Sequence, residues 1–115
     1  MRNDLRIAAG VSTEEVIMTI EKKKEGNRLI LAVSGRLDTM TAPELENVIK
    51  ENLDGVEELV LDFENLEYIS SAGLRVVLGT RKAMGDSGKF SVRNLCSDVR
   101  EIFDITGFSD IITIE

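Results

Sequence analysis

The fold is decided by the stretch LVLDFENLEYISSAGLRVVL, residues 59–78. Its opening is apolar and predicts a buried strand over residues 57–63. From Ser71 onward apolar residues recur three and four positions apart, which predicts a helix. Ser70 and Ser71 lie at the turn from strand to helix, where a serine hydroxyl commonly accepts a hydrogen bond from a backbone N–H group.

Patterns before this stretch predict a hairpin and a helix. A strand over residues 16–24, whose lysines protect an exposed sheet edge, pairs with an apolar strand at 29–33. The continuous apolar run of the second strand predicts that both of its faces are covered. Thr41 and Glu44 have the spacing of a capping box at the start of a helix, and Gly55 ends that helix.

The rest of the chain continues the alternation. A strand at 89–94 precedes a helix that is capped by Ser97 and ended by Gly107, and a last strand follows at 110–114. The predicted order is therefore β-β-α-β-α-β-α-β. Because strands alternate with helices, we expect an α/β fold with a mixed, mostly parallel sheet flanked by helices.

Length and composition limit the possible functions. The 115 residues suffice for one domain, which we expect at 16–115 after an arm at 1–15 that could be mobile. The net charge of −7 opposes binding to nucleic acids and to anionic membranes. The chain has no histidine, which excludes a Ser-His-Asp triad and histidine-ligated metal. General acid–base chemistry near neutral pH would fall to carboxylates or lysines, and we expect no cofactor and no metal.

The single cysteine, Cys96, predicts a small buried hydrophobic side chain rather than a disulfide or a metal ligand. With one free cysteine, no signal-like segment and no apolar run long enough to cross a bilayer, we expect the protein in a reducing cytoplasm.

Two other features of the sequence are similar to known catalytic or phosphorylation sites. The sequence Gly-Asp-Ser-Gly at residues 85–88 is similar to part of a serine-protease loop, but without histidine it is best explained as a turn. Asp62 lies near the end of a central strand, where receiver domains carry a phosphorylated aspartate. No acidic pair for Mg²⁺ follows the first strand, so phosphorylation of Asp62 is kept only as an alternative hypothesis.

The central stretch resembles the signature of the STAS domains, in the branch of bacterial anti-sigma factor antagonists. There an apolar strand and an acidic connection lead to Asp-Ser-x-Gly-Leu at the start of a helix. Ser71, Gly73 and Leu74 match this pattern, while Ser70 stands where the family commonly has Asp. The sequence GRLDTMTAP at residues 35–43 is similar to a second family segment, Gly-x-Leu-Asp-x-x-Thr-Ala-Pro.

The resemblance covers residues 18–115 and implies a binding switch. In that family the unphosphorylated antagonist binds an anti-sigma factor that is also a serine kinase, and this releases a sigma factor. The kinase then phosphorylates the family serine, here Ser71 or, as the second choice, Ser70. The complex dissociates and a serine phosphatase resets it. ATP and Mg²⁺ belong to the kinase, and we expect the antagonist to be a monomer or a weak dimer.

The resemblance also implies a partner-binding edge that consists of Asp38, Thr39, Ser70, Ser71 and Gly73. The fold would place the loop with Asp38 and Thr39 beside the Ser71 end, and Gly73 would let another backbone approach closely. A structural STAS subunit of a transport or signalling complex, docking through the same edge without phosphorylation, is the alternative function. Local sequence alone also allows both serines to be simple helix caps.

Overall fold

The computed structural model describes residues 18–115, so the predicted arm at 1–15 and the first two residues of the predicted first strand lie outside it. The described elements follow the order β1 (Met18–Glu25), β2 (Arg28–Leu37), α1 (Ala42–Asn52), β3 (Glu58–Asp62), β4 (Leu66–Ile69), α2 (Ser71–Met84), β5 (Lys89–Arg93), α3 (Ser97–Ile105), the 3₁₀ helix η1 (Phe108–Asp110) and β6 (Thr113–Ile114). The predicted α/β class is confirmed, whereas β4 and η1 are additions to the predicted order. The predicted last strand at 110–114 is wrong over residues 110–112, because η1 ends at Asp110 and β6 contains only Thr113 and Ile114.

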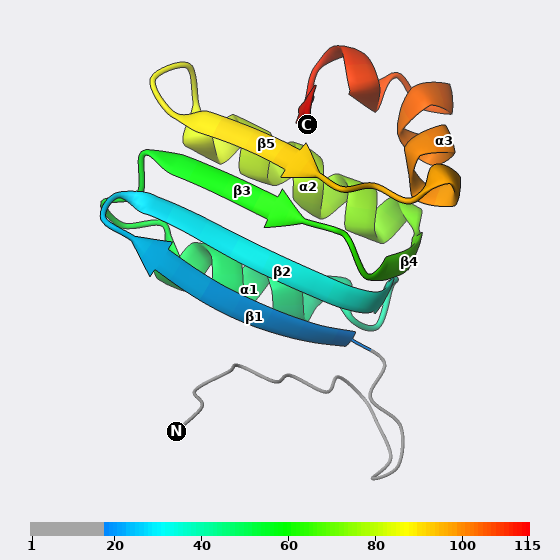
Figure 1. The fold of residues 1–115 in the computed structure, drawn as a ribbon, viewed down its shortest axis with the longest axis horizontal. Helices are drawn as coiled ribbons and strands as arrows, with labels where there is room; N and C mark the ends of the chain where they lie inside the picture. The colour runs from blue at the N-terminus through cyan, green and yellow to red at the C-terminus, as the bar shows by residue number, and fades with distance from the viewer. Residues whose placement is uncertain (1–17) are drawn as a thin grey trace, which may run out of the picture.

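The strands form one mixed sheet in the order β1-β2-β3-β5-β6 (Figure 1), and β4 pairs with the far end of β2. β1 is antiparallel to β2, which confirms the predicted hairpin, and Gly26 has the positive φ of 65° that this tight turn requires. The other pairs are parallel. β1 forms an edge of the sheet, as its exposed lysines predicted.

Strand β4 lies between β3 and α2, where the sequence pattern predicts only a connecting segment. Leu66 and Ile69 are buried and the two residues between them are exposed, so β4 lacks the strict alternation of a half-buried strand. It pairs only with the end of β2, after a register shift between Gly35 and Arg36. A four-residue strand of this kind depends on a distant partner and leaves little local signal.

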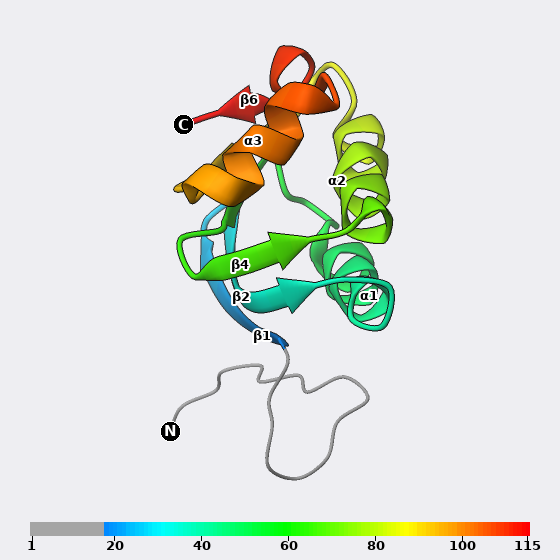
Figure 2. The ribbon, with the colours of Figure 1, turned by 90° about the vertical axis from the view of Figure 1, so that its right-hand side faces the viewer.

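Helices α1 and α2 cover one face of the sheet, as the two views in Figures 1 and 2 agree. α3 packs against β4 and η1 instead. None of the helices within residues 18–115 is long and apolar enough to cross a membrane. The core between sheet and helices is largely aliphatic, and its largest fully buried side chains include Phe63, Phe103, Leu29, Leu31, Leu59 and Leu61.

Neither α1 nor α2 covers the opposite face of the sheet (Figure 1), yet the prediction that β2 is covered on both faces is confirmed for Leu29, Ile30 and Leu31, which are all buried. Ile30 of β2 and Val60 of β3 are paired in register there and are nonetheless buried. Two residues earlier on the same strands Arg28 is paired with Glu58, and their charged groups lie 3.5 Å apart. Long side chains can cover apolar surface with their stems while their charged ends stay in water.

Three of the predicted helix ends need correction. Thr41 precedes α1 but makes no side-chain cap, because its hydroxyl binds within the preceding loop. α3 begins at Ser97 with Cys96 as the residue before it, and neither side chain caps the helix. α1 ends at Asn52, before Gly55.

Cys96 is half-buried rather than buried, with its Sγ 3.5 Å from the carbonyl oxygen of Leu66.

Candidate functional site

The two motifs singled out in the sequence meet where β2 and β4 end side by side. Leu37 pairs with Ile69 in register, and the N–H group of Ser70 donates a hydrogen bond to the carbonyl oxygen of Leu37 at 2.9 Å. The chain leaves β2 into the loop with Asp38 and leaves β4 directly into α2. Because the carboxyl ends of parallel strands meet at one edge, the two segments form one surface, here called the Ser71 edge: residues 38–40, 68, 70 and 71.

Ser70 is the N-cap of α2. Its backbone is extended, its Oγ accepts a hydrogen bond from the N–H group of Gly73 at 3.4 Å, and its carbonyl oxygen accepts one from Leu74 at 2.9 Å. Serine and aspartate are both good N-caps. Ser70 therefore does the capping at the position where the family commonly has Asp, and its hydroxyl is already engaged.

Ser71 is the first residue of α2 and is exposed. Within residues 18–115 its hydroxyl makes no hydrogen bond. The first turn of α2 contains no acidic residue, so no carboxylate of that turn neutralises the positive end of the helix dipole. The two serines thus differ: Ser70 holds the helix, and Ser71 presents a free hydroxyl in a setting that favours negative charge.

Gly73 has a structural role inside this chain. A Cβ atom there would lie 2.8 Å from both Ile69 Cγ1 and Leu37 Cγ, closer than side chains tolerate. The glycine therefore lets α2 approach the ends of β2 and β4. Gly73 and Leu74 are both buried, and Leu74 belongs to the core. Contact between Gly73 and a partner stays a prediction.

The loop after β2 is held by Asp38 and Thr41. Asp38 Oδ1 accepts hydrogen bonds from the N–H groups of Met40 at 3.0 Å and Thr41 at 3.2 Å. The fully buried Thr41 donates from Oγ1 to the carbonyl oxygen of Arg36 and accepts from the N–H group of Asp38, both at 2.8 Å. Asp38 thereby shapes the loop, while Thr39 is exposed and forms no hydrogen bond within the described residues.

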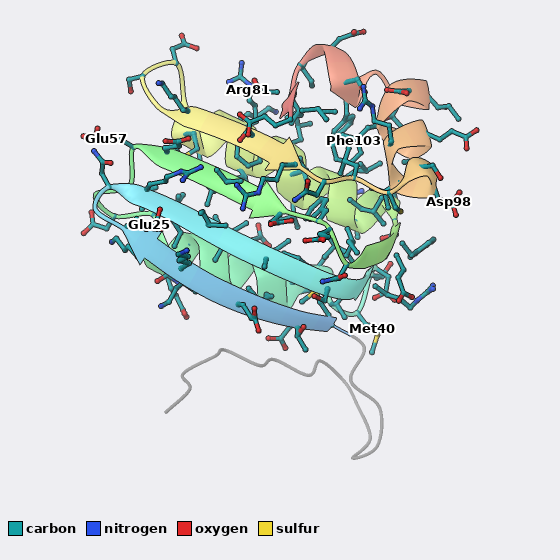
Figure 3. The ribbon with its side chains drawn as sticks, in the orientation of Figure 1. Glu25, Met40, Glu57, Arg81, Asp98 and Phe103 are labelled. Carbon is teal, nitrogen blue, oxygen red and sulfur yellow. The ribbon has the colours of Figure 1, made fainter. Side chains whose placement is uncertain are left out.

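Sequence analysis missed two exposed apolar side chains at this edge. Met40 is 63% exposed and projects from the loop after β2 (Figure 3), and Tyr68 on β4 is 37% exposed. The Arg36 guanidinium lies 4.3 Å from the centroid of the Tyr68 ring and holds it by a cation–π contact. Period-two alternation would have placed Tyr68 on the same face as the buried Leu66, so no signal in the sequence predicts its exposure.

Asp62 is engaged in structural contacts. Its carboxylate accepts hydrogen bonds from Asn94 at 3.1 Å, Arg93 at 3.2 Å and the N–H group of Glu64 at 3.0 Å. Burial raises the pKa of Asp62, but these hydrogen bonds and the Arg93 charge outweigh it, so the pKa lies below the usual aspartate value. Within residues 18–115 no cluster of His, Cys, Asp or Glu could hold a metal ion.

The sequence model of the STAS domain family matches residues 19–115 of this chain, which is almost all of the part that the structure describes. The chain belongs to the STAS domain family. The match confirms the resemblance inferred from the two motifs and removes the alternative of a receiver domain phosphorylated on Asp62. It does not by itself distinguish a phosphorylated switch from a structural STAS subunit.

Relatives of this STAS domain are anti-sigma factor antagonists. The anti-sigma-B factor antagonist of Staphylococcus aureus is 30% identical over 99 residues, which cover 84% of this chain and 92% of the relative. An anti-sigma factor antagonist from Mycobacterium paratuberculosis shares the fold with a TM-score of 0.79 at 26% identity, covering 94% of this chain and 89% of that one. Unphosphorylated SpoIIAA, another such antagonist, has a TM-score of 0.74 at 19% identity, covering 84% and 88%.

Proposed function

We propose that this protein is an anti-sigma factor antagonist that binds an anti-sigma factor with serine kinase activity, and that phosphorylation of Ser71 ends this binding. The observation that carries the proposal is the exposed Ser71 hydroxyl, which has no hydrogen-bond partner within residues 18–115, at the N-terminus of a 14-residue helix. The relatives named above are anti-sigma factor antagonists, which supports the general part of the proposal. The protein then acts by binding, without catalysis of its own, in a bacterial cytoplasm.

The phosphorylation step needs nothing from this chain beyond the hydroxyl. The partner kinase transfers the γ-phosphoryl group of its own ATP to Ser71 Oγ, ADP leaves, and the hydroxyl proton passes to a base of the kinase. The phosphate adds about −1.5 to −2 charges. At the N-terminus of α2 the dipole favours this charge by about 0.3–1 kcal/mol. Phosphorylation therefore leaves the fold intact, and a serine phosphatase can reverse it.

The effect of the phosphate falls on the interface. Met40 and Tyr68 offer exposed apolar surface beside Ser71, and such side chains anchor protein–protein interfaces when they are desolvated. A dianion placed in that surface must lose water or face a carboxylate, which costs several kcal/mol. Since about 1.4 kcal/mol is a tenfold change in affinity, one phosphate is sufficient to separate the bound and the free state.

Mass spectrometry after incubation with ATP and each anti-sigma factor kinase of the same genome tests the proposal. One of these kinases should place an acid-stable phosphate on Ser71. Ser70→Ala is the matched control: it should still be labelled, with lower stability through the lost cap, whereas Ser71→Ala should not be labelled. Ser71→Asp should bind the kinase more weakly than the wild type does.

Two results would contradict the proposal. Labelling that disappears in Ser70→Ala but persists in Ser71→Ala would move the switch to the capping serine. If no kinase labels the chain and Ser71→Asp binds every partner as tightly as the wild type, there is no phospho-switch. The Ser71 edge would then be a permanent docking surface, as in a structural STAS subunit of a transport or signalling complex.

A further inference from the structure

The outer side of the helical layer is hollowed between α1 and α2, which lie side by side in both views (Figures 1 and 2). One hollow of about 160 Å³ starts beside Ser71 and is lined by Ala72, Arg75 and Pro43 among others. A second of about 90 Å³ continues towards the other end of the helices and is lined by Ile49, Leu53, Gly79 and Ala83 among others. Glu46 and Val76 line both hollows, so they form one groove.

Gly79 forms part of the wall of this groove, although the fold does not require a glycine at this position. A Cβ atom at Gly79 would have no heavy atom within 4 Å, in contrast to Gly73 on the same helix. The residue lies inside α2 and is exposed. A glycine inside a helix costs about 1 kcal/mol relative to alanine. The fold would therefore be more stable with a side chain here, and the groove is deeper without one.

The charges around the groove select an acidic occupant. Arg75 and Lys82 lie four residues before and three residues after Gly79, so all three occupy one exposed stripe of α2. Neither cation lies within 4.0 Å of a carboxylate among residues 18–115, although the chain as a whole has a net charge of −7. On α1, Lys50 is paired with Glu46 at 3.5 Å. The uncompensated charge of the groove is thus positive.

We infer that the groove between α1 and α2 binds an amphipathic helix of the anti-sigma factor, with small or apolar residues facing Gly79 and carboxylates facing Arg75 and Lys82. The groove is continuous with the Ser71 edge, because Ala72 and Arg75 of its first hollow follow Ser71 in the first turns of α2. Helix-in-groove contacts of this kind use an apolar stripe flanked by charge. The inference rests on the proposed function, since it extends the interface of the same partner.

The test uses the anti-sigma factor that phosphorylates Ser71. Its affinity for purified full-length variants of this protein is measured by isothermal titration calorimetry. Gly79→Leu fills the groove and should weaken binding about tenfold or more, with an unfolding midpoint no lower than that of the wild type. Asn47→Leu, an exposed position on α1 outside both hollows, adds the same side chain without a change of charge. This matched control should bind within about twofold of the wild type. Lys82→Glu should slow association about threefold or more at low salt.

Each other outcome overturns the inference. If the wild type binds and Gly79→Leu binds within about twofold of it, the groove is unused while the proposed function stands. If light scattering shows that the wild type self-associates and Gly79→Leu does not, the occupant is a second copy of this chain. If no anti-sigma factor of the same genome binds the wild type, the proposed function fails and the groove loses its partner with it.

Discussion

Two glycines of α2 should respond to the same substitution with opposite signs. In Gly73→Ala the new methyl carbon would lie 2.8 Å from Ile69 Cγ1 and from Leu37 Cγ. These are carbons close to the backbone, on side chains that are 2% and 0% exposed, so neither can swing away. Overpacking of this kind costs about 1–3 kcal/mol. The gain of up to about 1 kcal/mol for alanine over glycine in a helix offsets part of it, which leaves a net loss of up to about 2 kcal/mol.

Gly79→Ala is the matched comparison on the same helix. Its methyl group meets no heavy atom within 4 Å, so only the helix term remains, and the free energy of unfolding should rise by up to about 1 kcal/mol. Urea denaturation followed by circular dichroism measures both changes as shifts of the midpoint at constant slope. A Gly73→Ala variant at least as stable as the wild type would mean that Leu37 and Ile69 yield to the methyl group, and would refute steric exclusion as the role of Gly73.

Two further stability predictions follow from the polar contacts near the sheet ends. Thr41→Val leaves the carbonyl oxygen of Arg36 and the N–H group of Asp38 without their partner, so the free energy of unfolding should fall by about 1–3 kcal/mol. The control Thr41→Ser keeps the hydroxyl and should lose less stability in urea denaturation. Equal losses of stability in the two variants would contradict this role of the hydroxyl. Asp62 has a lowered pKa, so its contribution to stability is present above the unfolded pKa of about 3.9 and is lost as pH falls through the folded value. The unfolding free energy of Asp62→Asn should therefore fall less steeply on acidification below about pH 4 than that of the wild type, and parallel curves would exclude this linkage.

Sequence periodicity was sufficient for the elements that carry their own pattern. The β1–β2 hairpin, the helices α1 and α2 and the parallel strands β3 and β5 were all predicted, although β2 extends four residues beyond its predicted end, to Leu37. The two motifs also placed the loop with Asp38 beside Ser71, and the register of β2 with β4 confirms this placement. Local hydrophobic spacing and turn residues determine such features, because they act within one or two turns of helix or within one strand.

What the sequence left open depended on contacts between distant segments. β4 forms because its backbone pairs with the end of β2, and the sequence of its four residues does not indicate this pairing with β2. Thr41 looked like a helix cap, yet its hydroxyl is used inside the loop that follows β2. The family motif predicted contact between Gly73 and a partner, and the structure shows in addition that Ile69 and Leu37 of this chain approach it closely.

The sequence by itself determined the α/β class, the family and the presence of two adjacent hydroxyls at the start of α2. The family motif ranked Ser71 before Ser70, and the tertiary structure supplied the physical difference between them: Ser70 Oγ accepts the hydrogen bond from Gly73, while Ser71 is exposed one residue further on. The distinction depends on where α2 begins relative to the end of β4. That position is set by the backbone hydrogen bond from Ser70 to Leu37 and by the close packing of Gly73, which join segments more than thirty residues apart.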